Sequence, residues 1–131
     1  MRVVVPLLLV ALLAAACGGG STTGEARTAV AITFWPDGEG QGAKKTARLA
    51  CDPPSGTVPD GAAACATLAS PAGRTALGPV PLDRMCTELY GGPAEARIVG
   101  TVAGEPIDAQ LSRINGCEIE RWETLSALLP A

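Results

Sequence analysis

The sequence predicts an α+β domain in which an antiparallel sheet of four to five strands is covered by two helices. Four short segments alternate apolar and polar residues with the period of two that a half-buried strand requires. One later segment repeats its apolar residues close to every 3.6 positions, which is typical of a helix that packs on one face. The 131-residue chain is long enough for one such domain.

The first two strands are expected to form a hairpin. In residues 28–34, alternation places Val30, Ile32 and Phe34 on one face. The connection that follows is rich in glycine and turn residues. Residues 45–51 then alternate again and return as the second strand.

A short helix is expected after this hairpin. Residues 53–56 contain two prolines and read as a rigid loop, and Asp60 is the predicted N-cap of a helix over residues 62–69. Residues 70–81 contain three prolines and two glycines. We therefore expect them to form an irregular loop.

The second half of the domain is predicted to contain another hairpin and a second helix. Residues 95–102 alternate, Ala103-Gly104 forms a turn, and the alternation continues over residues 107–111. Residues 118–129 have helical periodicity and are expected to form one continuous helix. The predicted domain thus covers residues 28–131.

The N-terminus has the features of an export signal. Arg2 is followed by an uninterrupted apolar run over residues 3–16. A helix of this length spans only about 21 Å, which is too short for a hydrocarbon core of about 30 Å. We therefore predict that residues 1–16 are a signal peptide and not a permanent membrane span.

The residues around Cys17 predict a lipid anchor. Small residues precede the cysteine and a Gly-Gly-Gly-Ser segment follows it, which resembles the bacterial lipobox, whose cysteine is lipidated. The alternative is ordinary cleavage that leaves Cys17 as a free thiol. Residues 17–27 would be the anchor cysteine and a flexible tether. We expect the protein on the outer face of a bacterial cell membrane, or secreted if no lipid is attached.

The number of cysteines agrees with this prediction. Five cysteines in an exported chain leave one unpaired, and lipidation of Cys17 removes it. The remaining four allow three pairings, of which closeness in sequence favours Cys51–Cys65 and Cys86–Cys117. Such bonds would stabilise the fold by about 3 and about 4 kcal/mol. A zinc site of four cysteines is the alternative, but the chain lacks a Cys-x-x-Cys pair.

Composition argues against several classes of function. The chain has no histidine, which removes Ser-His-Asp and Cys-His catalysis and the usual ligands of zinc hydrolases. The net charge is −3 and Lys44-Lys45 is the only basic doublet, so nucleic-acid binding is not expected. We expect neither an enzyme nor a bound cofactor or metal.

The last predicted helix carries several acidic residues. Glu118, Glu120 and Glu123 could form a paired-carboxylate site. The alternative, which we favour, is a solvated face near a helix N-terminus, where negative charge is stabilised. Arg113 and Arg121 have the same interpretation as solvated surface residues.

Two cysteine-bearing regions carry a resemblance to a known family. The first reads CDPPSGTVP at residues 51–59 and ACATL at 64–68. The second reads MCTELY at residues 85–90, with NGCE at 115–118. Together they resemble the Streptomyces subtilisin inhibitor family, and the similarity extends over residues 28–122.

This resemblance implies a fold, a partner and a mechanism. It implies the disulfides Cys51–Cys65 and Cys86–Cys117, a five-stranded sheet with two helices, and often a homodimer. It also implies that the protein inhibits an extracellular serine protease of the subtilisin type through a substrate-like loop.

The resemblance further assigns roles within the loop. Glu88 would lie just before the scissile bond and Leu89 just after it, while Asn115 would support the loop by hydrogen bonds. The implied reactive loop consists of Cys86, Thr87, Glu88, Leu89 and Tyr90.

Two residues depart from the family pattern. Val58 replaces a histidine of the family signature at a position away from the loop. Glu88 occupies a position where subtilisin-like enzymes favour apolar or large residues, and desolvating an unpaired carboxylate is costly. Either the target protease accepts glutamate, or the loop does not inhibit.

Two functions follow. The first is a lipid-anchored inhibitor of a subtilisin-like or glutamate-preferring serine protease. The second is a non-inhibitory module of the cell envelope that binds another protein with the same scaffold. Glu88 favours the second function, and so does Gly91-Gly92, because glycines reduce the rigidity of a loop.

Overall fold

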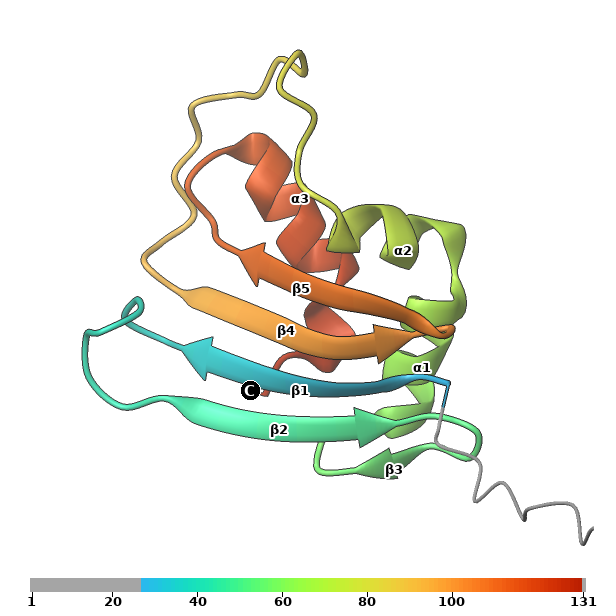
Figure 1. Cartoon of the computed structure of the whole chain (residues 1–131). Coiled ribbons are helices and arrows are strands. Elements are labelled where there is room, and N and C mark those ends of the chain that lie inside the picture. Colours follow the sequence, from blue (N-terminus) through green and yellow to red (C-terminus); the bar gives the residue numbers. More distant parts are fainter. Residues whose placement is uncertain (1–26, 131) are drawn as a thin grey trace, which may run out of the picture.

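A computed structural model describes residues 27–130, so the predicted signal peptide, Cys17 and nearly all of the tether lie outside the described residues. The described chain forms one antiparallel five-stranded sheet with helices packed on one of its faces (Figure 1). This confirms the predicted α+β fold. The elements in chain order are β1 (Ala29–Trp35), β2 (Lys45–Ala50), β3 (Ser55–Gly56), α1 (Gly61–Ala69), α2 (Pro71–Leu77), β4 (Glu95–Val102), β5 (Glu105–Leu111), α3 (Gly116–Thr124) and the 3-10 helix η1 (Ser126–Leu128).

The sheet has the strand order β3-β2-β1-β4-β5, with β1 at its centre. Both predicted hairpins are confirmed: β1 pairs with β2, and β4 pairs with β5. The turn between β4 and β5 has positive φ at Ala103 and Gly104, which is the geometry of a two-residue type I′ hairpin. This turn lies at one end of the sheet, and the chain that enters β4 lies at the other.

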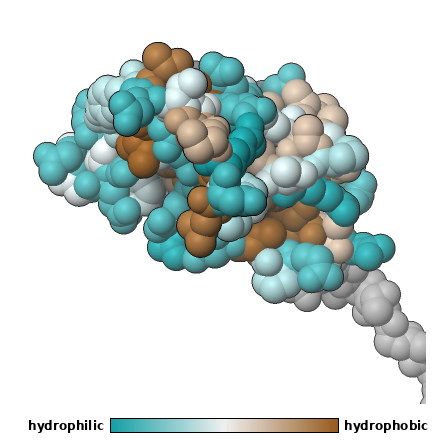
Figure 2. Space-filling view, turned by 90° about the horizontal axis from the view of Figure 1, so that it is seen from above, coloured by the Kyte–Doolittle hydropathy of each residue, from teal (hydrophilic) through white to brown (hydrophobic). Residues whose placement is uncertain are grey.

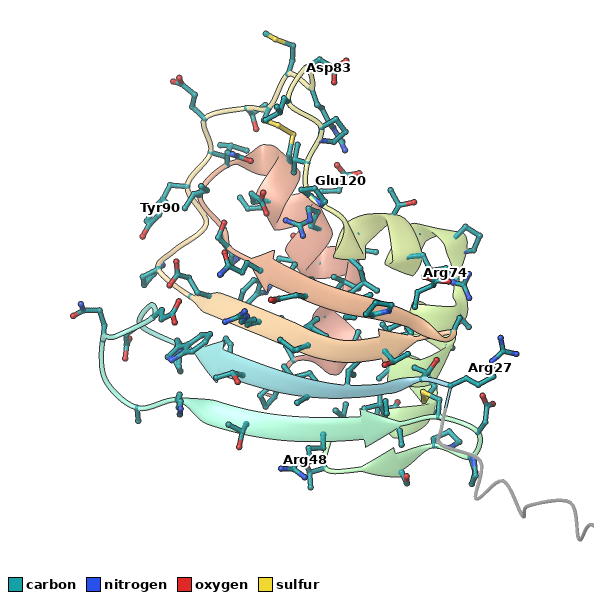
Figure 3. All side chains as sticks on the ribbon, in the orientation of Figure 1. Arg27, Arg48, Arg74, Asp83, Tyr90 and Glu120 are labelled. Atoms are coloured by element: carbon teal, nitrogen blue, oxygen red, sulfur yellow. A yellow bond between two sulfur atoms is a disulfide. The ribbon has the colours of Figure 1, made fainter. Side chains whose placement is uncertain are left out.

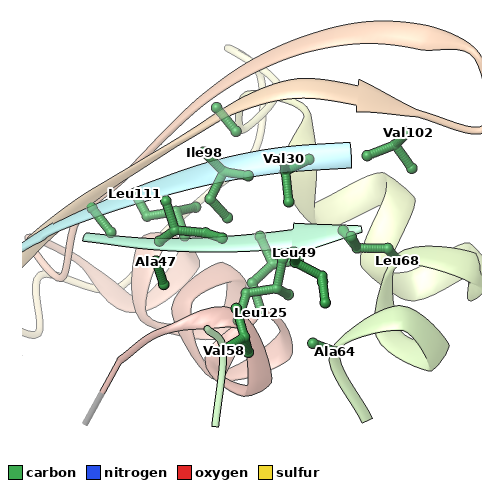
Figure 4. Close-up of a cluster of buried hydrophobic side chains, with 14 of the residues drawn as sticks. Val30, Ala47, Leu49, Val58, Ala64, Leu68, Ile98, Val102, Leu111 and Leu125 are labelled. Carbon is green, nitrogen blue, oxygen red and sulfur yellow. The ribbon is translucent and has the colours of Figure 1, made fainter. Parts of the chain in front are cut away.

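The core lies between the sheet and the helices, as the alternation of the strands predicts. Val30 and Ile32 are buried on β1, Ala47 and Leu49 on β2, and Ile98 on β4. Figure 4 shows these strand residues facing the side chains of α1 and of the chain after α3. Few aromatic residues take part, and Phe34 and Trp122 pack against the cluster with ring centroids 5.9 Å apart.

Helix α2 corrects one expectation. The prolines and glycines of residues 70–81 predicted an irregular loop, but Pro71–Leu77 is helical. Pro71 occupies the first turn, where its missing N–H costs nothing, and the Ser70 hydroxyl accepts a hydrogen bond from Gly73 N at 3.0 Å. Gly73 is buried so closely against α1 that a Cβ there would lie 1.9 Å from the carbonyl oxygen of Thr67. The described chain therefore has three α-helices instead of two.

The ends of the other elements also differ from expectation. Asp60 caps α1 as predicted, because its Oδ1 accepts from Ala63 N at 2.9 Å. Helix α3 ends at Thr124 instead of continuing to residue 129, and η1 follows it. This break lets Leu125 and Leu128 both reach the core. Two residues of the expected rigid loop form the short edge strand β3.

Two disulfides hold this fold together, and both have the favoured pairing. Cys51–Cys65 joins the end of β2 to α1, and Cys86–Cys117 joins the chain before β4 to the first turn of α3. Within residues 27–130, no helix is long and apolar enough to cross a membrane. The same residues contain no cluster of three or more potential metal ligands of the His, Cys, Asp or Glu type.

Candidate functional site

The segment between α2 and β4 projects from the domain as a long exposed loop (Figure 1). Its side chains are open to solvent: Leu89 is 63% exposed and Tyr90 is 67% exposed. Figure 3 shows Asp83 at the tip of this projection and the Tyr90 side chain pointing away from the domain. Among the described residues, no hydrogen bond or ion pair holds the Glu88 side chain. The centre of the loop is thus free to contact another molecule.

The N-terminal side of this centre is attached to α3. Cys86 is bonded to Cys117, and the carbonyl oxygen of Thr87 accepts a hydrogen bond from Gly116 N at 3.0 Å. A Cβ on Gly116 would lie 2.1 Å from Thr87 Oγ1, which is far inside van der Waals contact. Only glycine therefore lets Thr87 lie this close to the helix.

The C-terminal side is attached to the chain that leads into α3. Gly91 N donates to the carbonyl oxygen of Arg113 at 2.7 Å. Gly91 also packs tightly, since a Cβ there would lie 3.0 Å from Ile119 Cδ1 and 3.1 Å from Arg113 Cβ. Gly92 has φ of +117°, a conformation that L-residues with side chains rarely adopt. Gly91 thus permits close contact with the domain and Gly92 permits the backbone turn, which are roles that the expectation of a loosened loop did not include.

Both attachments belong to one short segment, residues 113–117, which we call the support segment. It contacts the loop through Gly116 and Cys117 on one side of Glu88–Leu89 and through Arg113 on the other. The bond between Glu88 and Leu89 is therefore the centre of a short exposed span that is fixed at both ends. A protease can bind an exposed span of this kind as it binds a peptide substrate.

Comparison with known proteins agrees with this geometry. Residues 13–113 match the family described as subtilisin inhibitor-like. The chain belongs to this family. Its members are protease inhibitors and not enzymes, which assigns this subtilisin inhibitor-like protein a protease as its general partner. No curated protein matches the chain.

The match ends before α3, so it covers the loop but not most of the support segment of this subtilisin inhibitor-like protein. Cys117 and Gly116 lie beyond residue 113, as does Asn115. The contacts of these residues with the loop therefore come from the structure itself.

Asn115 contacts the loop less directly than the resemblance implies. Its Oδ1 accepts a hydrogen bond from Glu118 N at 3.0 Å, which makes it the N-cap of α3. The direct hydrogen bond to the loop comes from the next residue, Gly116. Asn115 thus fixes the start of the helix that carries Gly116 and Cys117. The Asn-Gly pair before a cysteine was a signal for this cap that sequence reasoning did not use.

The acidic face of α3 is more ordered than expected. Glu118 pairs with Arg121 at 2.7 Å, and Arg121 Nε also donates to the carbonyl oxygen of Ala76 at 2.9 Å. Glu120 pairs with Arg84, which lies in the loop two residues before Cys86. Glu120 and Glu123 are exposed to solvent, as expected, whereas Glu118 is largely buried in its ion pair. These side chains tie α3 to α2 and to the loop, and do not form a carboxylate pair.

Two side chains with shifted pKa values, Arg97 and Asp108, lie away from the loop, on the face of the sheet that carries no helix. Arg97 donates two hydrogen bonds to Asp108, at 2.8 and 2.6 Å. These bonds hold the pKa of the Asp108 carboxyl below its usual value and raise the pKa of the Arg97 guanidinium. Because both side chains are exposed, we assign this pair to the surface of the sheet and not to the loop.

Proposed function

We propose that the protein is an exported, lipid-anchored inhibitor of an extracellular serine protease. Its reactive loop is Cys86–Tyr90, and the bond presented to the protease is Glu88–Leu89. The observation that carries this proposal is the support segment, which contacts the loop on both sides of that bond.

The physical basis of this inhibition is preorganisation. A loop that is already held on both sides loses little conformational entropy when a protease binds it. The protease serine would attack the Glu88 carbonyl carbon and release the α-amine of Leu89, which leaves an acyl-enzyme. If that amine stays in place, it attacks the acyl carbon and forms the peptide bond again. Release of the cut inhibitor is then slow compared with resynthesis.

The glutamate before the scissile bond determines the kind of protease that would bind. Glu88 is exposed in the free protein, so its carboxylate would lose water on entering an apolar specificity pocket. A pocket with a cation or several hydrogen-bond donors would compensate for this loss. We therefore propose a glutamate-preferring protease as the first partner and a subtilisin-like protease as the second.

The end of the molecule that carries the loop offers further contacts. Figure 2, which is seen from this end, shows apolar side chains as separate patches among hydrophilic residues. Five of the large apolar residues with high exposure belong to the loop region, and these are Leu82, Met85, Leu89, Tyr90 and Ile114. Exposed apolar residues around a fixed loop are typical of a surface that binds a protein.

The position of the loop is compatible with a lipid on Cys17. The described chain starts at Arg27, whose carbonyl oxygen accepts from Gly104 N in the turn after β4. The loop enters β4 at the other end, about 25 Å away along this eight-residue strand. Figure 3 shows Arg27 and Tyr90 at opposite ends of the domain. An N-terminal anchor would therefore leave the loop exposed to proteases outside the cell.

Two further proposals concern binding. A homodimer would use the face of the sheet that carries no helix, where Ala29, Ala31 and Val99 are exposed (Figure 1).

The alternative function, a non-inhibitory module that binds another envelope protein through the same loop, is favoured by one observation. Glu88 is a poor residue for the apolar pocket of a subtilisin-like enzyme.

The test is a titration of residual protease activity. The mature chain with Cys17→Ser would be added to subtilisin and to a glutamate-specific serine endopeptidase. We expect tight, slowly reversible inhibition of the glutamate-specific enzyme. Absence of inhibition of both enzymes, with the protein intact or rapidly cut, would leave the binding-module function.

A further inference from the structure

The two sides of the loop are held by different kinds of contact. On the N-terminal side, the Cys86–Cys117 disulfide would keep its covalent hold even if Glu88–Leu89 were cut. On the C-terminal side, no disulfide lies between Leu89 and β4. The new amine of Leu89 would stay in place only through the contacts of Gly91 and Gly92.

Ile119 packs against Gly91, and the other contacts are with Arg113. Its carbonyl oxygen accepts from Gly91 N, its Cβ packs under Gly91, and its Nη1 would lie 3.8 Å from a Cβ on Gly92. The Arg113 side chain therefore runs beneath both glycines. It supports the part of the loop that no covalent bond attaches.

The far end of the Arg113 side chain lies over Trp122. The guanidinium Cζ is 5.8 Å from the centroid of the indole ring, which is within the range of a cation–π contact. Trp122 in turn contacts Phe34 of β1. This series of contacts connects the Gly91-Gly92 segment to the sheet through a side chain on α3.

Arg113 also has a feature that a simple surface residue would not have. Its Nε is buried without a hydrogen-bond partner. A buried donor without a partner destabilises the fold, so an apolar residue would be more favourable here if the side chain only filled space. The planar guanidinium, however, can stack on the indole ring while its stem packs under the glycines. This combination is specific to arginine.

We propose that Arg113 is a positioning residue that keeps the Leu89 amine in place after the loop is cut. Its effect is on resynthesis of the Glu88–Leu89 bond and not on the first docking of the protease. This inference rests on the proposed function, because resynthesis requires a protease that cuts the loop. Arg113 would thus hold the C-terminal side of the loop by non-covalent contacts, while the Cys86–Cys117 disulfide holds the N-terminal side.

The test compares Arg113→Met and Arg113→Lys with the unaltered protein. Met keeps an apolar stem but loses the guanidinium. Lys keeps the positive charge but loses the planar group that stacks on Trp122. Each protein is incubated with a catalytic amount of the glutamate-specific serine endopeptidase until the ratio of cut to intact chain is constant. We expect Arg113→Met to raise this ratio about tenfold, with Arg113→Lys in between. The rate of first docking should stay within about twofold.

A matched control is Arg48→Met, which removes an exposed arginine from β2, far from the loop. This variant should leave the ratio of cut to intact chain unchanged. The inference is overturned if Arg113→Met leaves that ratio unchanged. It is also overturned if docking slows in proportion to the change in the ratio, since Arg113 would then only maintain the intact loop.

A second measurement needs no protease. The amide hydrogen of Gly91 is bonded to the Arg113 carbonyl oxygen, so its exchange with solvent reports the hold on this segment. We expect Arg113→Met to speed this exchange about tenfold while exchange in β4 stays unchanged. If the protein inhibits no protease but Gly91 responds in this way, the proposed function and the role in resynthesis fail together, and only the contact of Arg113 with the intact loop stands. If the protein inhibits a protease and the exchange rate of the Gly91 amide does not change in Arg113→Met, the positioning role fails and the proposed function stands.

Discussion

Gly116 donates its amide hydrogen to the carbonyl oxygen of Thr87 at 3.0 Å, and the absence of a Cβ on Gly116 makes this approach possible. The bond joins the start of α3 to the residue before the proposed scissile pair. Together with the Cys86–Cys117 disulfide, it fixes the conformation of the loop on this side. The identity of residue 116 should therefore control how well the loop fits a protease.

The first prediction is that Gly116→Ala weakens inhibition about tenfold or more, because the new Cβ displaces Thr87 from its position. In the double variant with Thr87→Ala, the atom 2.1 Å from the new Cβ is gone and the next contact is 3.3 Å. This variant should regain part of the affinity. Inhibition constants of the three proteins test the prediction, and an additive loss in the double variant would contradict it.

The second prediction separates the two disulfides. Replacing Cys86 and Cys117 by serine should lower the free energy of unfolding by about 4 kcal/mol and convert the inhibitor into a substrate that is cut and released. Replacing Cys51 and Cys65 should cost about 3 kcal/mol but leave inhibition intact wherever the domain remains folded. Thermal unfolding and product analysis together check this. Equal effects of both replacements on inhibition would be inconsistent with the proposed loop.

The third prediction concerns the caps of two helices. Asn115→Ala and Asp60→Ala each remove a side-chain acceptor from a helix N-terminus, so each should lower stability by about 1 kcal/mol. Only Asn115→Ala should also weaken inhibition, because α3 carries Gly116 and Cys117 while α1 carries no loop contact. The two variants thus control for each other. If both weaken inhibition equally, the effect comes from stability alone.

The fourth prediction concerns specificity. Glu88→Met should convert a weak ligand of subtilisin into a strong one, because an apolar side chain enters an apolar pocket without the desolvation cost of a carboxylate. The same change should weaken binding to a glutamate-specific enzyme. Titration of both enzymes with both proteins measures this change of specificity. An unchanged and negligible affinity for subtilisin would show that more than the Glu88 side chain prevents binding.

Four of the five strands were predicted from the sequence, and both disulfides have the pairing that closeness in sequence favoured and the family resemblance implied. Alternation gives the inward faces of β1, β2, β4 and β5 directly, because a strand places successive side chains on opposite faces. Helix α2 was missed because Pro71 was read as the end of regular structure, although proline is favoured in the first turn of a helix. The break between α3 and η1 was missed because it depends on the contacts of Leu125 and Leu128 with the core.

The sequence indicated which segment carries the candidate site, but of the direct contacts between this segment and the domain it predicted only the Cys86–Cys117 disulfide. The residues of the loop are visible in the sequence because they are contiguous and lie beside a cysteine. The roles of Gly116 and Arg113 depend on contacts between segments more than 20 residues apart, and no local pattern encodes them. Gly91-Gly92 was read as flexible for the same reason. Its close contacts become apparent only when Arg113 and Ile119 lie beneath it.

The equilibrium between the intact and the cut Glu88–Leu89 bond, approached from both sides, distinguishes an inhibitor from a substrate. Intact protein and protein already cut at this bond would each be incubated with a catalytic amount of the inhibited protease and followed by mass spectrometry. We predict that both samples reach the same mixture, with the cut chain converted back to the intact one in part. If the intact sample is cut completely and the cut sample never regains the bond, the loop is only a substrate and the inhibitor account is wrong.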